Sequence, residues 1–135
     1  VLVAYSGQMY LPQVFEGLME YLDYWWTGAV EHAGNGNLSP LGQPVRKVIN
    51  KWKPLVMFVK KGGLGFERTF EDWVQGAGPK KEHHNWQQNE RETVSLVETF
   101  TKPGELVVDP FAGSGGFCRV AHELGRVAIG AEILG

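Results

Sequence analysis

The chain has 135 residues, of which 43% are hydrophobic, and a formal net charge of −2. This length fits a single core, since domains commonly hold on the order of 100–150 residues. One cysteine, Cys118, excludes an internal disulfide framework. No run of ~18 apolar residues predicts a membrane span, and no charged-then-apolar leader opens the sequence. We therefore expect a cytoplasmic α/β protein.

The first sixty residues predict strands around one helix. Residues 1–5 are apolar and open as a strand, and two further strands are expected at 24–30 and 54–60. A loop rich in Gly, Asn and Pro, 34–44, lies between the second and third strands. The helix is predicted from apolar residues at near-helical spacing: Val14, Phe15, Leu18 and Leu22.

The most informative motif is Asp-Pro-Phe-Ala-Gly-Ser-Gly at 109–115, after the apolar run 106–108 and before a helical pattern. Glycines at 113 and 115 permit a tight turn and let a ligand lie against the main chain. A second buried strand is expected at 127–132, ending in Glu132. In open α/β sheets an acid at a strand's carboxyl end bonds ribose hydroxyls, so these parts predict a nucleotide-cofactor site.

The charge of Asp109 indicates which cofactor fits. A carboxylate before the turn repels a pyrophosphate and favours a positively charged amino group, as in S-adenosylmethionine. A dinucleotide fingerprint starting at Gly113 would need glycine at 118, where Cys118 stands. A plain strand-loop-helix connection is the alternative for a lone glycine pair, but the second strand and its acid favour the cofactor site.

Residues 103–133 resemble the cofactor-binding segment of DNA amino-methyltransferases, which modify the exocyclic nitrogen of adenine or cytosine. Residues 84–89 occupy the place of that family's His-Pro-Thr-Gln-Lys-Pro element, with Gln88 and Asn89 replacing Lys-Pro. The resemblance implies that this element covers the methionine end of the cofactor, and Trp86 is a candidate cover for the adenine ring. The expected cofactor-binding residues are Asp109, Pro110, Phe111, Ala112, Gly113, Ser114, Gly115, Glu132, Trp86, Gln87, Gln88 and Asn89.

The order of the segments resembles the permuted, beta-type members, in which the catalytic segment precedes the cofactor segment. Their catalytic signature is Asp, Asn or Ser followed by Pro-Pro and Tyr or Trp, and this chain has no Pro-Pro pair. We therefore name no catalytic residue. We expect the signature upstream of Val1, a chain that is the C-terminal part of a methyltransferase, and no methylation by this polypeptide alone.

By resemblance the fold is an S-adenosylmethionine-dependent methyltransferase (Rossmann-like) α/β sandwich. Its sheet is mostly parallel, with one antiparallel strand and the order 3-2-1-4-5-7-6. The chain supplies counterparts of strands 5, 6, 7, 1 and 2, but not the fourth, which bears the signature. Since unpaired backbone groups are costly when buried, we expect a gap, a rearranged pairing or a partner strand there. The expected division is a substrate-side half, 1–60, a middle segment, 61–84, and a cofactor half, 85–135.

DNA is the partner that the resemblance implies, and lysines in the middle of the chain are the candidate phosphate contacts. The segment 61–84 is equally consistent with a DNA-contacting loop and a solvated surface loop. The pair His83 and His84 does not supply the ligands of a zinc site, so no metal is expected. A non-catalytic cofactor- or DNA-binding module is the main alternative, and a methyltransferase for RNA or a small molecule is a third. The candidate DNA-binding residues are Lys53, Lys60, Lys61, Lys80 and Lys81.

Overall fold

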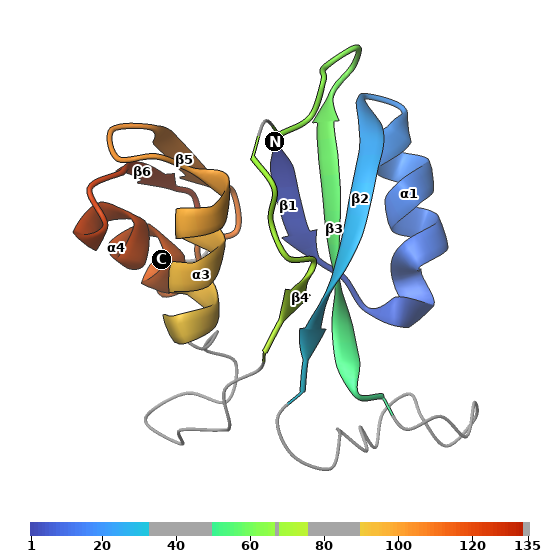
Figure 1. The fold of residues 1–135 in the computed structure, drawn as a ribbon, viewed down its shortest axis with the longest axis horizontal. Coiled ribbons are helices and arrows are strands. Elements are labelled where there is room, and N and C mark those ends of the chain that lie inside the picture. Colours follow the sequence, from blue (N-terminus) through green and yellow to red (C-terminus); the bar gives the residue numbers. More distant parts are fainter. Residues whose placement is uncertain (33–49, 67, 76–89, 134–135) are drawn as a thin grey trace. The chain divides into compact units, whose positions relative to one another are not determined.

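The computed structural model describes residues 1–32, 50–66, 68–75 and 90–133. The chain divides into two compact units, Val1–Gly78 and Pro79–Gly135. The first unit contains strands β1 to β4 and helix α1, and the second contains helices α3 and α4 with strands β5 and β6 (Figure 1). None of the described helices is long and apolar enough to cross a bilayer.

The first unit is built on a four-stranded sheet with the order β1-β3-β2-β4. Strand β3 lies between β1 and β2 and is antiparallel to both, which is the 5-7-6 order implied by the resemblance. Strand β4 adds a short parallel edge to β2. The strand bounds are Leu2–Tyr5 for β1, Leu22–Glu31 for β2, Trp52–Lys60 for β3 and Trp73–Val74 for β4.

Strand β3 forms the core of this unit. Its residues 54–59 are all buried, as expected when both faces of a central strand are covered. Helix α1, Leu11–Met19, follows the short 3-10 turn η1, Gln8–Tyr10, and has a proline in its first turn. Its Phe15 ring packs against Phe58 and Tyr24, with centroids 5.9 and 5.3 Å away. Leu22 opens β2, so its assignment to the predicted helix was wrong: the chain leaves the helix at Glu20.

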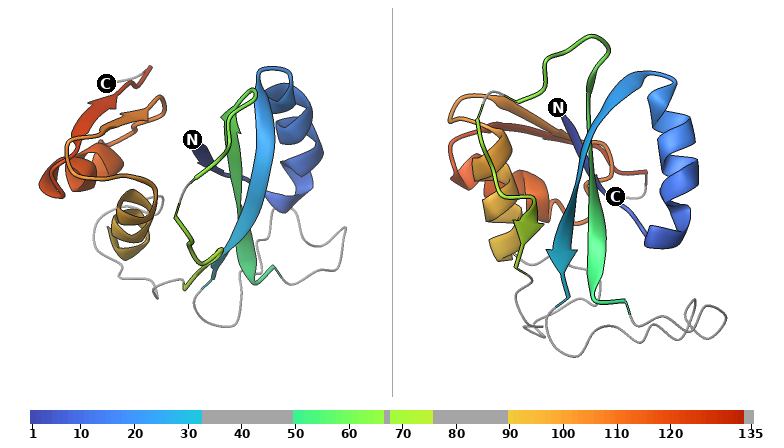
Figure 2. Two further views of the ribbon diagram at one scale, coloured as in Figure 1. Left: turned by 45° about the horizontal axis from the view of Figure 1, so that its top comes forward. Right: turned by 45° about the vertical axis from the view of Figure 1, so that its right-hand side comes forward.

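Residues 61–66 and 68–75, the returning segment, lie along β2 (Figure 2). A bulge in β2 between Tyr24 and Trp26 leaves Trp25 without a paired residue. The Trp25 ring packs against Phe66 and Phe70, with centroids 6.3 and 5.5 Å away. An ideal Cβ on Gly65 would lie 2.6 Å from the Trp25 indole nitrogen, so only glycine fits there. This described part of 61–84 is therefore packed structure rather than the solvated loop of one sequence interpretation.

The second unit pairs two parallel strands with two helices. Helix α4 connects the strands and packs against both, and helix α3 packs against α4. Val97, Val107 and Ala121 form its buried core, with Phe117, Leu124 and Ala128 packed around them. The bounds are Glu90–Phe100 for α3, Leu106–Asp109 for β5, Gly116–Glu123 for α4 and Val127–Gly130 for β6.

Strands β5 and β6 are not buried on both faces, so that prediction was wrong. Val107 and Ala128 pack into the core, whereas Leu106, Val108, Val127 and Ile129 are 53–59% exposed. Successive side chains of a strand point to opposite faces, and only one face of this pair packs against helices of its unit.

The expectation of one mostly parallel sheet also differs from the structure. The described residues form two sheets, and the larger is mainly antiparallel because β3 runs opposite to both neighbours. In the implied strand order, the parallel pairs that join the two halves all involve the fourth strand. That strand has no counterpart among the described residues, which leaves β5 with β6 and β2 with β4 as the parallel pairs there.

Candidate functional site

The turn after β5 is shaped by backbone conformation. Asp109 ends the strand, and its Oδ1 accepts a hydrogen bond of 3.1 Å from the Phe111 amide. Gly113 and Gly115 have positive φ of 52° and 77°, which other L residues adopt only with strain. The Gly115 amide donates to the Ala112 carbonyl at 2.7 Å, and α4 begins at the next residue. The sequence prediction of strand, glycine turn and helix is confirmed here.

Glu132 closes this turn from the other strand. Its Oε2 accepts a 2.7 Å hydrogen bond from the Gly113 amide, and its Oε1 accepts one of 2.9 Å from the Ile133 amide. The Ala112 amide also donates to the Ala131 carbonyl at 2.9 Å. The structure thus brings together the two predicted parts of the site. One detail was wrong: β6 ends at Gly130, so Glu132 lies in the segment that follows the strand.

Gly130 is a residue of the site that sequence reasoning missed. An ideal Cβ on it would lie 2.8 Å from the Ala112 Cβ and 3.0 Å from the Cys118 sulfur. Glycine is therefore required for β6 to approach the turn and α4 this closely. The available signal was a glycine at the end of an apolar strand, which often marks a close backbone approach.

The outer side of the turn is open. An ideal Cβ on Gly115 or Gly116 meets no atom within 4 Å, and one on Gly113 meets only the Glu132 carboxylate, at 4.0 Å. The Phe111 side chain beside it is 83% exposed. Internal packing therefore does not explain these glycines or this exposed ring, whereas a ligand lying against the main chain does.

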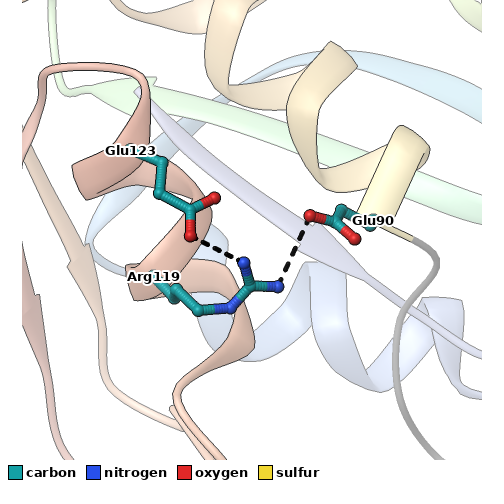
Figure 3. A network of polar contacts seen from close by, with 3 residues as sticks. All are labelled: Glu90, Arg119 and Glu123. Carbon is teal, nitrogen blue, oxygen red and sulfur yellow. Dashed lines mark hydrogen bonds and ion pairs between the residues drawn. The ribbon is translucent and has the colours of Figure 1, made fainter.

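Charged groups around the turn favour a cationic ligand. Burial, and then the charge of Asp109, raise the pKa of the Cys118 thiol. Arg119 on α4 is engaged with acids: it lies 2.8 Å from Glu123 and 3.5 Å from Glu90 on α3 (Figure 3). Two carboxylates at the turn and an arginine already paired make a poor site for a pyrophosphate and a good one for an amino group.

Arg126 supports the site from within and was also missed. It is only 8% exposed, and its guanidinium donates to the Thr101 hydroxyl at 2.9 Å and the Thr101 carbonyl at 2.8 Å. A third hydrogen bond, of 2.5 Å, reaches the Leu124 carbonyl. Arg126 thereby ties the chain after α3 and the end of α4 to the start of β6, and a lone arginine in a sequence does not signal such a role.

The structure does not bring the described lysines together. Lys60 and Lys61 lie at one end of β3, where the Lys61 ammonium donates to the Met19 carbonyl at 3.2 Å. Lys53 lies near the other end, with its ammonium 4.1 Å from the centroid of the Tyr5 ring. The remaining predicted site residues lie outside the described ones: Lys80, Lys81, Trp86, Gln87, Gln88 and Asn89. Within the described ranges, no three His, Cys, Asp or Glu side chains cluster as metal ligands would.

Comparison with known proteins gives a family match over most of the chain. The model of the N6_N4_Mtase family, described as DNA methylase, matches residues 16–134. A "Putative methylase YubD" of Escherichia coli (strain K12) is 44% identical over 52 residues, which are 38% of this chain and 23% of that protein. The chain therefore spans less than a quarter of this curated relative.

Solved structures of DNA methyltransferases share the fold. The M1.HpyAVI–SAM complex matches with a TM-score of 0.72 and 20% identity, over 96% of this chain and 66% of that one. TTHA0409, a DNA modification methylase from Thermus thermophilus, matches with a TM-score of 0.70 and 17% identity, over 98% and 64%. The cytosine-N4-specific PvuII DNA methyltransferase matches with a TM-score of 0.68 and 16% identity, over 93% and 52%. At such identities the likeness establishes the fold.

Proposed function

The chain belongs to the DNA methylase family whose model it matches, and we propose that it forms the cofactor-binding part of an S-adenosylmethionine-dependent DNA methyltransferase. The proposed target is the exocyclic amino group of adenine or cytosine, as the sequence resemblance implies. The solved neighbours, which include a cytosine-N4-specific enzyme and a SAM complex, support both parts of this proposal.

The contact between Gly113 and Glu132 carries the proposal. A carboxylate held 2.7 Å from a backbone amide at an open glycine turn is already positioned to accept hydrogen bonds from ribose hydroxyls. Binding then exchanges one donor for another, so Glu132 needs no new conformation. Asp109 is the proposed partner of the cofactor's amino group, because its carboxylate is fixed beside the turn by the Phe111 amide.

The other residues of the turn fit the same ligand. Gly115 and Gly116 leave the main chain bare for the nucleoside, and the exposed Phe111 ring offers an apolar surface beside it. When bound, S-adenosylmethionine supplies an electrophilic methyl group on a sulfonium. The residues of this unit hold and orient that group, and orientation alone contributes strongly to the rate of a transfer reaction.

Methyl transfer also needs an acceptor for the amino protons of the target base, and the usual signature is absent from these 135 residues, which contain no Pro-Pro pair. We therefore propose that the polypeptide binds cofactor but does not methylate DNA alone. The same observation favours a second candidate, a non-catalytic cofactor- or DNA-binding module.

Calorimetry with S-adenosylmethionine and S-adenosylhomocysteine tests cofactor binding. We expect saturable heat for the chain, at least tenfold weaker binding for Glu132→Gln, and unchanged binding for Glu123→Gln, an exposed acid of α4. Absence of heat from a folded chain contradicts the proposal. Transfer of labelled methyl to DNA then separates the candidates: transfer by a polypeptide that includes the Pro-Pro segment supports the enzyme, and its absence there supports the module.

A further inference from the structure

A second polar site lies at the edge of the sheet where β1 ends and β3 begins. The two strands are antiparallel, with Tyr5 opposite Leu55, and the Ser6 amide donates to the Pro54 carbonyl at 3.0 Å. The turn η1 then brings Gln8 to Asn50, 42 residues along the chain. Ligands of α/β proteins commonly bind outside the carboxyl ends of strands, and β1 ends here.

Four hydrogen-bonding groups fix the two side-chain amides. The Gln8 Nε2 donates to the Asn50 Oδ1 at 3.2 Å and to the Trp52 carbonyl at 3.1 Å. The Asn50 Oδ1 accepts a second bond, of 3.2 Å, from the Trp52 amide. Both hydrogens of the Gln8 amide and both lone pairs of the Asn50 oxygen are thus used, so neither amide can be flipped without losing these bonds.

This network leaves one acceptor and one donor open. The Gln8 Oε1 and the Asn50 Nδ2 make no hydrogen bond within the described part of the chain. Both side chains are half-buried, so these two groups are held in place rather than free in solvent. Holding two amides in fixed positions has an entropic cost, and the open pair offers a ligand an acceptor and a donor from amides in direct contact.

We propose that Gln8 and Asn50 recognise adenine in DNA through its N6 amino group and N7. This inference rests on the proposed function, because DNA is the substrate there. Asn and Gln commonly read adenine by accepting from N6 and donating to N7, and here the two roles are divided between Gln8 Oε1 and Asn50 Nδ2. In the major groove only adenine presents an amino donor beside a ring acceptor, so the pair distinguishes A·T from G·C.

Neighbouring side chains suit a nucleic-acid surface. Lys51 follows Asn50 and is exposed, and the Lys53 ammonium lies over the Tyr5 ring at the same edge. The Tyr10 ring, in the same turn as Gln8, is 63% exposed. Glu31, opposite Trp52 in the β2–β3 ladder, is the acid at this edge. Phosphate contacts of lysines position a protein on DNA, while the amide pair reads the base.

The test compares three short duplexes by fluorescence anisotropy at low salt: alternating A·T, the same duplex with 7-deazaadenine, and G·C. The 7-deaza base carries C–H in place of N7 and keeps N6. We expect about tenfold weaker binding of the deaza duplex than of the A·T duplex, and similar weakening for G·C. Equal affinities for the A·T and deaza duplexes, or no duplex binding at all, overturn the inference.

Two variants separate recognition from folding. Asn50→Asp keeps the oxygen that Gln8 and Trp52 contact but replaces the open donor, so the ratio of A·T to deaza affinities should fall to about one. Gln8→Leu should abolish the same ratio, and Gln13→Leu, at an exposed position of α1, should leave it unchanged. A ratio that persists in Asn50→Asp contradicts the assignment. Calorimetry with S-adenosylmethionine distinguishes the two proposals, since heat without any N7 dependence leaves the proposed function standing and removes this site.

Discussion

The glycine turn at 109–115 and the pair of Gln8 and Asn50 are two ways of building a polar site. The turn presents backbone, shaped by glycines and closed by one carboxylate from a segment 19 residues away in the chain. The amide pair presents side chains, 42 residues apart and fixed by contacts with Trp52. The first site leaves a compact motif in the sequence, whereas the second leaves two ordinary amides that no motif connects.

The largest expected effect tests how far the turn depends on its support. Arg126→Met removes a buried group that donates to two carbonyls and one hydroxyl, leaving them without a partner. Because each unsatisfied buried group costs about 1–3 kcal/mol, we expect a loss of about 3 kcal/mol in the free energy of unfolding, measured by urea denaturation. Arg119→Met, whose ion pairs are exposed, should change stability little. Equal effects of the two variants would show that Arg126 does not hold this unit together.

Gly130→Val tests the close approach of β6 to the turn. The added side chain meets Ala112 and Cys118 at 2.8 and 3.0 Å, so we expect a loss of about 2 kcal/mol and weaker cofactor binding. Gly116→Ala is the matched control for stability, since an ideal Cβ there meets nothing within 4 Å. Unchanged thermal unfolding of Gly130→Val would contradict the packing described here.

Removing the network of the amide pair should matter less for stability. Gln8→Ala deletes two hydrogen bonds at a half-buried site, and we expect a loss of about 1 kcal/mol in the free energy of unfolding. Gln13→Ala, on the exposed side of α1, should be neutral or slightly stabilising, because alanine is the better helix former. If Gln8→Ala costs several kcal/mol, the pair is mainly a structural bracket.

The smallest effect is electrostatic. Burial and the Asp109 carboxylate raise the pKa of the Cys118 thiol, so thiolate absorbance in the folded chain should develop at a higher pH than in the unfolded chain. The folded state keeps its proton where the unfolded state has lost it. The stability contributed by this thiol is therefore full below the unfolded pKa and is lost as the pH rises through the folded one. Asp109→Asn should lower the folded midpoint, and an unmoved midpoint would place the carboxylate too far away to matter.

Much of the fold could be predicted because its signals are local. The apolar run before Asp109 and the glycines after it specify a strand, a turn and a helix, and the structure has all three. Burial could not be predicted in the same way. Leu106 and Ile129 lie in apolar runs, yet they are exposed, because which face of a strand is covered depends on packing partners and not on the strand's own residues.

Long-range contacts set the other limit. The bulge at Trp25 and the packing of Phe66 and Phe70 against it join segments that no short motif connects, so the middle segment was expected as a loop. The meeting of Glu132 with Gly113 was predictable because a parallel strand pair fixes where its carboxyl ends lie. The meeting of Gln8 with Asn50 was not, since it depends on the conformation of the turn after β1.

The most direct test of the central claim observes the Gly113 amide itself. In a ¹⁵N-labelled chain its proton should resonate downfield, because it donates to the Glu132 carboxylate at 2.7 Å. Saturating S-adenosylmethionine should shift this signal strongly as ribose hydroxyls compete for the carboxylate, while the Gly17 amide on α1 stays in place. A Gly113 signal that does not move when the cofactor is bound would contradict the account.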